Sequence, residues 1–183
     1  MYKLFIAFLL ATAILATGCN SKKENAVAPE VVEVQPRGIA EPADDSHFTK
    51  LFLACTIDMG NSIDLQAATV EKLRGMNGSY LVWNPRRSGG FNSSAEEIEY
   101  QIKWELDRLE KCDVIIMNIL GTSKSPITLL EMGIHIRSGK LYVACEPDFY
   151  RHDNVRITCG HYGVPLCNSL DELFEELKSS GKL

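Results

Sequence analysis

Two glutamates in this sequence occupy helix positions where the surrounding pattern calls for apolar side chains. The first is Glu131, in the segment SPITLLEMGIHI. It has helical spacing to Ile127, Leu130 and Ile134, so all four side chains share one face and the glutamate interrupts an apolar stripe. An isolated ionised carboxylate is costly in such a place, and function is a common reason for keeping one. Glu131 is therefore a candidate catalytic residue.

The second glutamate, Glu105, repeats this pattern in the preceding helical segment. Its stripe contains Ile98, Ile102 and Leu109. Two carboxylates on consecutive helices of one fold are candidates to converge at a single site. Both glutamates also have an ordinary explanation as partners of nearby cations. Those cations are His135 for Glu131, and Lys103 or Arg108 for Glu105.

Four apolar runs alternate with amphipathic segments along the chain. The runs cover residues 51–56, 80–84, 113–119 and 141–145, and 164–167 is a shorter fifth run. They do not alternate with polar residues, which is typical of strands buried on both faces of a parallel sheet. The helical segments cover residues 63–74, 95–111, 126–138 and 170–179. This order predicts an α/β domain of three layers, with a parallel sheet of about five strands and right-handed crossovers.

The loops at one end of this sheet are the expected place for a ligand, because open parallel sheets bind ligands beyond the carboxyl ends of their strands. The loops that follow the first four predicted strands are polar and rich in turn-forming residues. The helix that carries Glu131 starts here too, with Ser125 as the expected N-cap and Pro126 as the first helical residue. The predicted binding residues are Asp58, Asn84, Arg86, Arg87, Asn118 and Ser125.

The N-terminus has the layout of a secretory signal. Lys3 is followed by an apolar run and then by Gly18 and Cys19, and this run is shorter than the roughly 20 residues that cross a bilayer. The segment LATGC resembles the lipobox of bacterial lipoproteins, although Ala16 stands where leucine is more common. We expect a signal peptide at residues 1–18 and lipidation at Cys19, which would anchor the protein in the bacterial cell envelope, facing the periplasm or the exterior. An ordinary signal peptide or a short anchor helix is the alternative.

Residues 19–47 are expected to form a flexible tether between this cysteine and the domain. They are rich in Pro, Ala, Glu and Val and have no helical or strand period. Within them, EVVEVQP could pair as an edge strand, but Pro29 and Pro36 bracket that stretch. The folded domain is then expected at residues 48–183, a length that can bury a substantial core.

The charge and cysteine content restrict the class of protein. The formal net charge is −5 with no basic run, so nucleic acid is not an expected partner. Apart from Cys19, five cysteines remain, and an odd number in an exported chain does not describe a disulfide framework. Several of them border apolar runs, which suggests small buried hydrophobes. Cys159, His161 and His152 lack a paired ligand spacing, and no metal or organic cofactor is expected.

Five segments, in this order, resemble the nucleoside 2-deoxyribosyltransferase family, in its 2-deoxyribosyltransferase-like subgroup. They are LACTIDMG, VWNPRR, IKWELDRLEKCDVIIMNI, SPITLLEMGIHIRSGKLYVAC and YGVPL. The resemblance covers nearly all of residues 51–173 and leaves out the signal and the tether. It implies a flavodoxin-like fold and chemistry at the N-glycosidic bond of 2'-deoxynucleosides, so a nucleoside or nucleotide is the expected small-molecule partner. Family members usually form homo-oligomers in which a neighbour completes the pocket, so a homo-oligomer is also expected.

The resemblance further implies roles for individual residues. Glu131 and Gly133 match the E-x-G pattern of the family's nucleophile, and Glu105 matches a second acid that assists the base. Ser125 departs from the family, whose transferases carry an acid six residues before the nucleophile. Related nucleotide hydrolases carry serine there, where a hydroxyl at a helix N-terminus suits a 5'-phosphate that a nearby arginine could also contact. The alternative is that Ser125 merely caps its helix.

Three functions remain open on this basis. The first is an enzyme that transfers or hydrolyses 2'-deoxynucleosides or their 5'-monophosphates, with a covalent intermediate on Glu131 and proton donation by Glu105. The second is a non-catalytic, lipid-anchored module that binds nucleosides, nucleotides or a protein, because Ser125 replaces the family's acid. The third is a structural envelope domain without a ligand, which would leave the two glutamates far apart or paired with cations.

Overall fold

The computed structural model describes residues 28–58, 62–89 and 93–183. The predicted signal peptide, Cys19 and residues 20–27 of the predicted tether lie outside the described residues. Among the helices in the described ranges, none combines the length and the hydrophobicity of a bilayer span.

The centre of the domain is a sheet of parallel strands. The described strands are β1 (Glu30–Val34), β2 (Thr49–Leu53), β3 (Ser79–Trp83), β4 (Val114–Ile119), β5 (Leu141–Cys145) and β6 (Leu166–Cys167). Their order across the sheet is β1-β3-β2-β4-β5-β6. Without β1, this is the flavodoxin-like order, in which the chain winds first to one side of its first strand and then to the other. The predicted three-layer, flavodoxin-like α/β fold is confirmed, with a 6-stranded sheet instead of one of about five strands.

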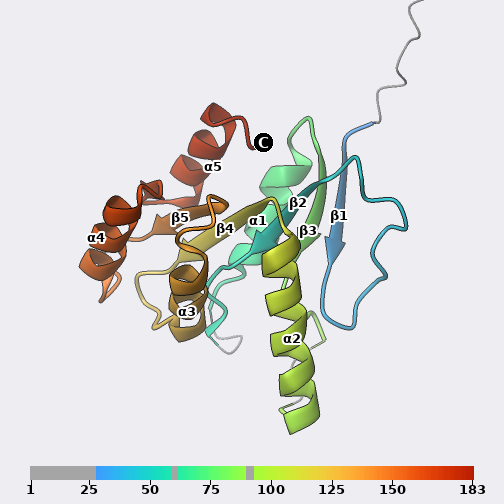
Figure 1. Ribbon diagram of the computed structural model, residues 1–183, viewed down its shortest axis with the longest axis horizontal. Helices are drawn as coiled ribbons and strands as arrows, with labels where there is room; N and C mark the ends of the chain where they lie inside the picture. Colours follow the sequence, from blue (N-terminus) through green and yellow to red (C-terminus); the bar gives the residue numbers. More distant parts are fainter. Residues whose placement is uncertain (1–27, 59–61, 90–92) are drawn as a thin grey trace, which may run out of the picture.

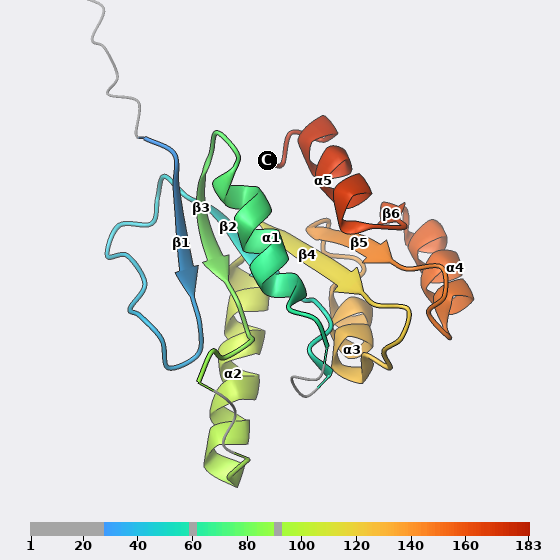
Figure 2. The same cartoon turned by 180° about the vertical axis from the view of Figure 1, so that it is seen from behind.

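Helices cover both faces of the sheet and make the outer two layers (Figure 1, Figure 2). The helices on one face are α1 (Leu65–Arg74) and α5 (Leu170–Ser179). Those on the other face are α2 (Ala95–Lys111), α3 (Pro126–His135) and α4 (His152–Tyr162). The N-terminal half of α2 continues beyond the carboxyl ends of the strands (Figure 1). The pair α2 and α3 therefore borders the end of the sheet at which a ligand is expected.

Successive residues of each central strand contribute to different cores. In β2, Phe52 packs beneath α2, α3 and α4, while Leu51 and Leu53 pack beneath α1 and α5. All three side chains are fully buried. A strand that is covered on both faces needs apolar residues at every position, which explains the unbroken apolar runs in the sequence.

The predicted bounds of two helices and one strand agree with the structure. These elements are α2, α5 and β5. Both helices start at a serine whose hydroxyl accepts a hydrogen bond from the backbone N–H three residues later, Ser94 from Glu97 and Ser169 from Glu172. Such caps are readable from sequence because only a few residue types can satisfy the first N–H groups of a helix.

Helix α4 has no counterpart among the predicted helical segments. Only Val155 and Cys159 on this helix are buried, so its apolar period is weak. Arg151, which precedes the helix, provides no capping hydrogen bond. A signal exists at its other end, where Gly163 adopts a left-handed conformation (φ 68°), as is common just after a helix.

The expected tether and domain boundary are wrong, because residues 30–34 form strand β1. This strand pairs with β3 along its whole length, from Glu30 beside Ser79 to Val34 beside Trp83, and lies at the edge of the sheet (Figure 1). Pro29 and Pro36 flank the strand instead of interrupting it, so the intervening N–H groups are free to pair. The edge-strand alternative is therefore the correct one, and the described fold already includes residue 30.

The predicted apolar stripes on α2 and α3 are also partly wrong. On α3, Ile127 and Leu130 are both 58% exposed, while the buried face carries Thr128, Glu131, Met132 and His135. This helix is apolar almost all round, so residue spacing alone did not identify its inner face. On α2, Ile98 is exposed because that part of the helix extends past the sheet (Figure 1).

Candidate active site

A pocket of about 270 Å³ lies at the carboxyl ends of β2 and β4. These two strands are neighbours, and the chain winds in opposite directions from them, which makes this the switch point of the sheet. The lining residues come from the segment after β2, from the loop after β3, from α2, and from the start of α3. Its volume is close to the lower end of the range of ligand pockets, about 300 Å³.

Four of the predicted site residues line this pocket, namely Asp58, Glu105, Ser125 and Glu131. The other four predicted binding residues, Asn84, Arg86, Arg87 and Asn118, are not among its lining residues. Both candidate catalytic residues thus reach one pocket from consecutive helices. The assignment of substrate contacts to individual residues stays a prediction.

Glu131 is the more buried member of the carboxylate pair, with only 8% of its surface exposed. Burial, and secondly the charge of Glu105, raises the pKa of Glu131 to about 8. The pocket therefore favours the protonated form of Glu131 at neutral pH. Among the ion pairs of the described residues, none includes Glu131, so the suggested pairing with His135 does not occur there.

Glu105 lies in α2 and is half-buried. Burial raises the pKa of Glu105, while a hydrogen bond from Gln101 and the charge of Arg87 act in the opposite direction. Gln101 Nε2 donates to Glu105 Oε1 over 2.7 Å. The suggested cation partners are engaged elsewhere, because Lys103 pairs with Glu99 and Arg108 with Glu41. Glu105 is therefore directed toward the pocket and not into a surface ion pair.

Asp58 and Ser125 face the same pocket from backbones in the left-handed region, with φ of 49° and 44°. Residues other than glycine rarely adopt this backbone conformation, which costs of order 1 kcal/mol or more. Such strain persists only where the surroundings enforce it, and it gathers at functional sites. Two strained residues that line one pocket therefore support its assignment as the candidate functional site.

The Ser125 hydroxyl belongs to a ring of hydrogen bonds and makes no capping bond to α3. Ser123 Oγ donates to the Leu120 carbonyl (2.8 Å), and the Leu120 N–H donates to Thr56 Oγ1 (3.2 Å). Ser125 Oγ lies 2.7 Å from Ser123 Oγ and 2.6 Å from Thr56 Oγ1. Because Ser123 already donates to Leu120, Ser125 donates to Ser123 and Thr56 donates to Ser125. The ring thereby uses the Ser125 proton and holds the end of β2 against the loop after β4.

The two arginines of the loop after β3 bind neighbouring protein groups. Arg86 donates to Ser62 through both terminal nitrogens and lies 3.4 Å from the Asp64 carboxylate at the start of α1. Arg87 donates to two side chains of α2, through Nε to Gln101 Oε1 and through Nη1 to Glu97 Oε2. Both guanidinium groups therefore fix the loop between its neighbouring helices.

The two asparagines have structural contacts as well. Asn84 Nδ2 donates to Glu33 Oε1 of β1 (2.7 Å), and its side-chain oxygen accepts from the Arg86 N–H. Asn118 is buried in β4, where its backbone carbonyl accepts from the Thr56 N–H. Strand β1 and the loop after β3 are consequently tied together close to the pocket.

Several residues that support the site are missing from the sequence-based prediction. Gln101 carries a readable signal, because it lies one helical turn before Glu105 and can reach it. Thr56 carries a weaker one, as a hydroxyl at the end of an apolar run. Glu33 had none, since its segment was assigned to the tether. Support by Ser123 depends on a loop conformation that local pattern does not encode.

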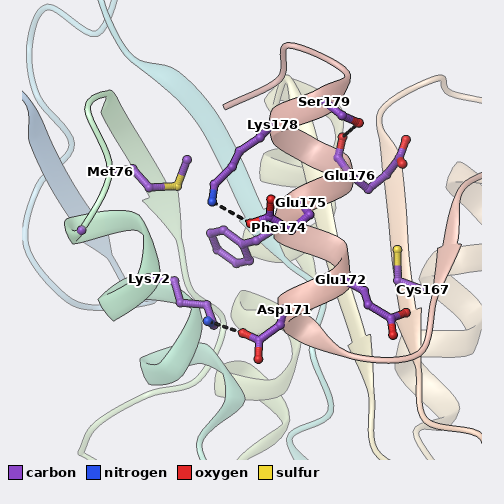
Figure 3. Close-up of a pocket in the computed structure, with 11 residues that line it drawn as sticks. Lys72, Met76, Cys167, Asp171, Glu172, Phe174, Glu175, Glu176, Lys178 and Ser179 are labelled. Atoms are coloured by element: carbon purple, nitrogen blue, oxygen red, sulfur yellow. Dashed lines mark hydrogen bonds and ion pairs between the residues drawn. The ribbon is translucent and has the colours of Figure 1, made fainter.

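A larger cavity, about 840 Å³, lies between the last turn of α1 and the length of α5 (Figure 3). Both of its lysines are in ion pairs, Lys72 with Asp171 and Lys178 with Glu175, as the dashed lines in Figure 3 mark. Neither candidate catalytic glutamate lines it. The smaller pocket, which both candidate catalytic glutamates line, is therefore the candidate active site.

Metal ligands are not gathered in the described ranges, where no three His, Cys, Asp or Glu side chains are grouped to hold an ion. The suggested ligand Cys159 is buried in the core beneath α4. Burial raises the pKa of Cys159 to about 11, which keeps it a thiol at neutral pH.

The fold and the pocket together define a flavodoxin-like domain that presents one buried and one half-buried carboxyl side chain at its switch point. Residues 49–149, more than half of the 183-residue chain, match the family model described as nucleoside 2-deoxyribosyltransferase like. The chain belongs to this family. No curated protein matches the chain. Membership indicates nucleoside glycosyl transfer by a transferase-like enzyme with a small-molecule nucleoside as its partner.

The matched range contains both glutamates and Ser125 and starts at the first residue of β2. It leaves out strand β1 and helices α4 and α5. The N-terminal strand is thus an addition to the part of the chain that matches the family, although it contacts the loop beside the pocket.

Proposed function

We propose that the protein cleaves the N-glycosidic bond of 2'-deoxynucleosides, with Glu131 as the nucleophile and Glu105 as the acid that assists the base. The observation that carries this proposal is the convergence of buried Glu131 and half-buried Glu105 on one pocket, where burial, and secondly the charge of Glu105, raises the pKa of Glu131. Coupled carboxyls of this kind divide acid and nucleophile roles in retaining glycosidases.

In the proposed reaction, ionised Glu131 attacks C1' of the sugar as the bond to the base breaks. The product is a covalent deoxyribosyl-enzyme, and the base leaves with a proton from Glu105. A second base then attacks C1' in a transfer, or water does so in a hydrolysis, and Glu131 is released. Without a 2'-hydroxyl the oxocarbenium-like transition state is easier to reach, so ribonucleosides should react poorly.

The protonation of the pair sets a condition for this mechanism. With a pKa of about 8, Glu131 is protonated at neutral pH before a substrate binds. Attack at C1' needs this carboxylate ionised and needs a proton on the leaving base. The proton must therefore pass from Glu131 to Glu105 and from Glu105 to the base during the first half of the reaction.

We further propose a neutral nucleoside as the preferred substrate over a 5'-monophosphate. Among the described residues, the ionisable side chains that line the pocket are the acids Asp58, Glu105 and Glu131 and the ammonium group of Lys124, so the acids outnumber the cation even with Glu131 protonated. A surplus of negative charge disfavours a phosphate dianion. Ser125 is the residue expected to favour phosphate, but its hydroxyl already donates its hydrogen bond to Ser123. With matched 2'-deoxynucleoside and 5'-monophosphate pairs, we expect the larger kcat/KM for the nucleoside.

The test of the function is a product assay on the full-length chain. Incubation with 2'-deoxynucleosides, with and without free adenine, separates transfer from hydrolysis, since transfer gives a new nucleoside and hydrolysis gives free deoxyribose. Glu131→Ala and Glu131→Gln are expected to abolish both products while the protein stays folded. Ligand binding without any product would instead support the non-catalytic binding module. Full turnover by a folded Glu131→Ala variant would exclude Glu131 as the nucleophile.

We also propose a homo-oligomer in which a second copy covers the rim of the pocket. Exposed apolar side chains gather on the two helices that flank it, Ile98, Ile102 and Leu106 on α2 and Ile127, Leu130 and Ile134 on α3. Ile127 belongs to this surface and lines the pocket as well. Apolar surface beside a pocket is typical of a protein interface.

For the cell, we propose a lipid anchor on Cys19 in the bacterial envelope, with the pocket facing away from the membrane. Strand β1 starts at Glu30, so only residues 20–29 separate it from Cys19, and they span at most about 35 Å. Glu30 pairs with Ser79, which places the chain entry at the amino ends of the strands, opposite the pocket. Labelling with a palmitate analogue is expected in the wild type and not in Cys19→Ala.

A further inference from the structure

Gln101 makes three hydrogen bonds with its side-chain amide, between the loop after β3 and Glu105. Its Oε1 accepts from Arg87 Nε over 2.8 Å. Its Nε2 donates to the Pro85 carbonyl over 2.9 Å and to Glu105 Oε1 over 2.7 Å. The amide therefore uses both of its hydrogens and one acceptor position.

Only one orientation of this amide fits its surroundings. If oxygen and nitrogen changed places, the amide nitrogen would face the Arg87 Nε–H, which is also a donor. The amide oxygen would then face Pro85 O and Glu105 Oε1, which are both acceptors. Arg87 thus forces Gln101 to present an N–H group to Glu105.

We propose that Gln101, oriented by Arg87, is a positioning residue that fixes which oxygen of Glu105 carries the transferable proton. Glu105 Oε1 accepts from the Gln101 amide, so the proton that Glu105 gives to the leaving base is carried by Oε2. This inference rests on the proposed function for the role of that proton. The contacts of Gln101 themselves do not depend on the reaction.

Further contacts hold Arg87 in the position that this arrangement needs. Arg87 Nη1 donates to Glu97 Oε2 over 2.8 Å in the first turn of α2. Glu97 also accepts from Arg37 over 3.1 Å, and Arg37 stacks on the ring of Tyr100 at 3.7 Å. Arg37 lies in the connection between β1 and β2, outside the family match. The N-terminal addition of this chain therefore supports the network that ends at Glu105.

The charged groups around Glu105 come from several elements. Glu131 approaches from α3, Arg87 from the loop after β3, Asp58 from the segment after β2, and Lys124 from the loop before α3. Burial raises the pKa of Glu105, and the Gln101 hydrogen bond is the larger of the two influences that lower it. Loss of the Gln101 N–H should consequently move the titration of Glu105 upward.

The test is a carboxyl-carbon NMR titration of the full-length protein labelled at glutamate. Gln101→Leu removes the donor, and we expect the Glu105 midpoint to rise by about one pH unit, the equivalent of one hydrogen bond to a charged group. Gln101→Glu keeps the length and the Arg87 partner but places an oxygen opposite Glu105, so a larger rise is expected. Glu99→Gln, an exposed change on the same helix, is the control and should leave the midpoint in place.

The kinetic readout is the pH profile of the same variants. In Gln101→Leu we expect kcat to fall about tenfold or more, with KM nearly unchanged and the acidic limb moved to higher pH. A merely structural role would lower the melting temperature of both Gln101 variants without moving the Glu105 midpoint, and that result overturns the proposal. If the wild type is active but the Glu105 midpoint does not move in the Gln101 variants, the positioning role of Gln101 is refuted and the proposed reaction still stands. If the Glu105 midpoint moves in the Gln101 variants but the wild type shows no turnover, the proposed reaction is refuted and the positioning of Glu105 by Gln101 still stands.

Discussion

Glu105 of α2 and Glu131 of α3 lie close enough for the charge of the first to raise the pKa of the second. They belong to consecutive helices on the same face of the sheet, and both reach the pocket at the carboxyl ends of β2 and β4. The pair behaves as one titrating unit, in which the second ionisation is resisted by the first. Burial, and secondly this coupling, link the fold to the proposed reaction, because they raise the pKa of Glu131 to about 8 and so favour a retained proton at neutral pH.

The pH profile of turnover should be bell-shaped, since the reaction needs one proton on the pair. As pH rises through about 8, the pKa to which Glu131 is raised, the pair loses that proton and kcat/KM should fall. On the acidic side, activity should fall below the raised pKa of Glu105, where both carboxyls are protonated and the nucleophile is lost. A profile that stays flat from about pH 7 to about pH 10 would contradict a shared proton.

Glu131→Gln should change how stability depends on pH. The folded pKa of Glu131 is raised from 4.5 to about 8, so between these values the folded protein holds a proton that the unfolded chain has lost. Stability that is present at low pH is therefore lost as pH rises through this window, by up to about 1.4 kcal/mol per pH unit. Glutamine is neutral throughout and avoids this loss.

Chemical denaturation of wild type and Glu131→Gln at several pH values checks this prediction. The difference in free energy of unfolding should grow in favour of the variant from about pH 5 to about pH 8 and then level off. Glu99→Gln serves as the control because Glu99 is exposed on α2. A constant difference between wild type and Glu131→Gln would mean that Glu131 titrates as an ordinary surface acid.

Removal of strand β1 should weaken the site as well as the fold. A chain that starts at residue 48 loses the pairing of β1 with β3 and the hydrogen bonds of Glu33 to Asn84 and of Gln35 to Ser88. It also loses the contact of Arg37 with Glu97. We expect a lower melting temperature and reduced kcat, whereas a chain that starts at residue 28 should behave like the full-length protein. Equal activity of the two truncated chains would contradict a supporting role for β1.

The hydroxyl ring should be sensitive to the loss of one member. Ser123→Ala leaves the Ser125 hydroxyl without its acceptor, and the Leu120 carbonyl loses the serine hydroxyl while it keeps the backbone N–H of residue 123. The loss of a buried hydrogen-bond partner costs about 1–3 kcal/mol, which thermal denaturation can measure. Because the ring also holds the strained backbone of Ser125, kcat/KM should fall with stability. Ser179→Ala on α5, far from the pocket, is the matched control.

The sequence singles out Glu105 and Glu131 because both interrupt apolar helix patterns, and the structure places both in the lining of one pocket. Their acidic chemistry stands out against apolar neighbours, and the unbroken apolar runs reveal the parallel sheet whose switch point they approach. The face of α3 is not readable, because Ile127 and Met132 are equally apolar and only the packed structure shows that Met132 is buried. Strand β1 is hidden by its prolines, since their effect depends on whether they flank or interrupt the pairing.

The site shows the same division between readable and hidden features. Asp58 and Ser125 are found through the rule for parallel sheets, while the internal contacts of Arg86 and Arg87 depend on partners distant in sequence. Loop conformation decides whether an arginine faces the ligand or the protein. Periodicity carries no information about that choice.

The last prediction concerns the exposed apolar surface on α2 and α3. Leu130→Glu places a charge at the centre of the α3 part of this surface, and it should dissociate the proposed homo-oligomer, because an unpaired charge is costly in an interface. Ile157→Glu makes the same change at an equally exposed position on α4 and should leave the oligomer intact. Sedimentation velocity reports the assembly state of each variant directly. If the second copy also completes the pocket, Leu130→Glu should lower activity at low protein concentration, and Ile157→Glu should not. A wild type that sediments as a monomer at every concentration tested would mean that this surface has another role.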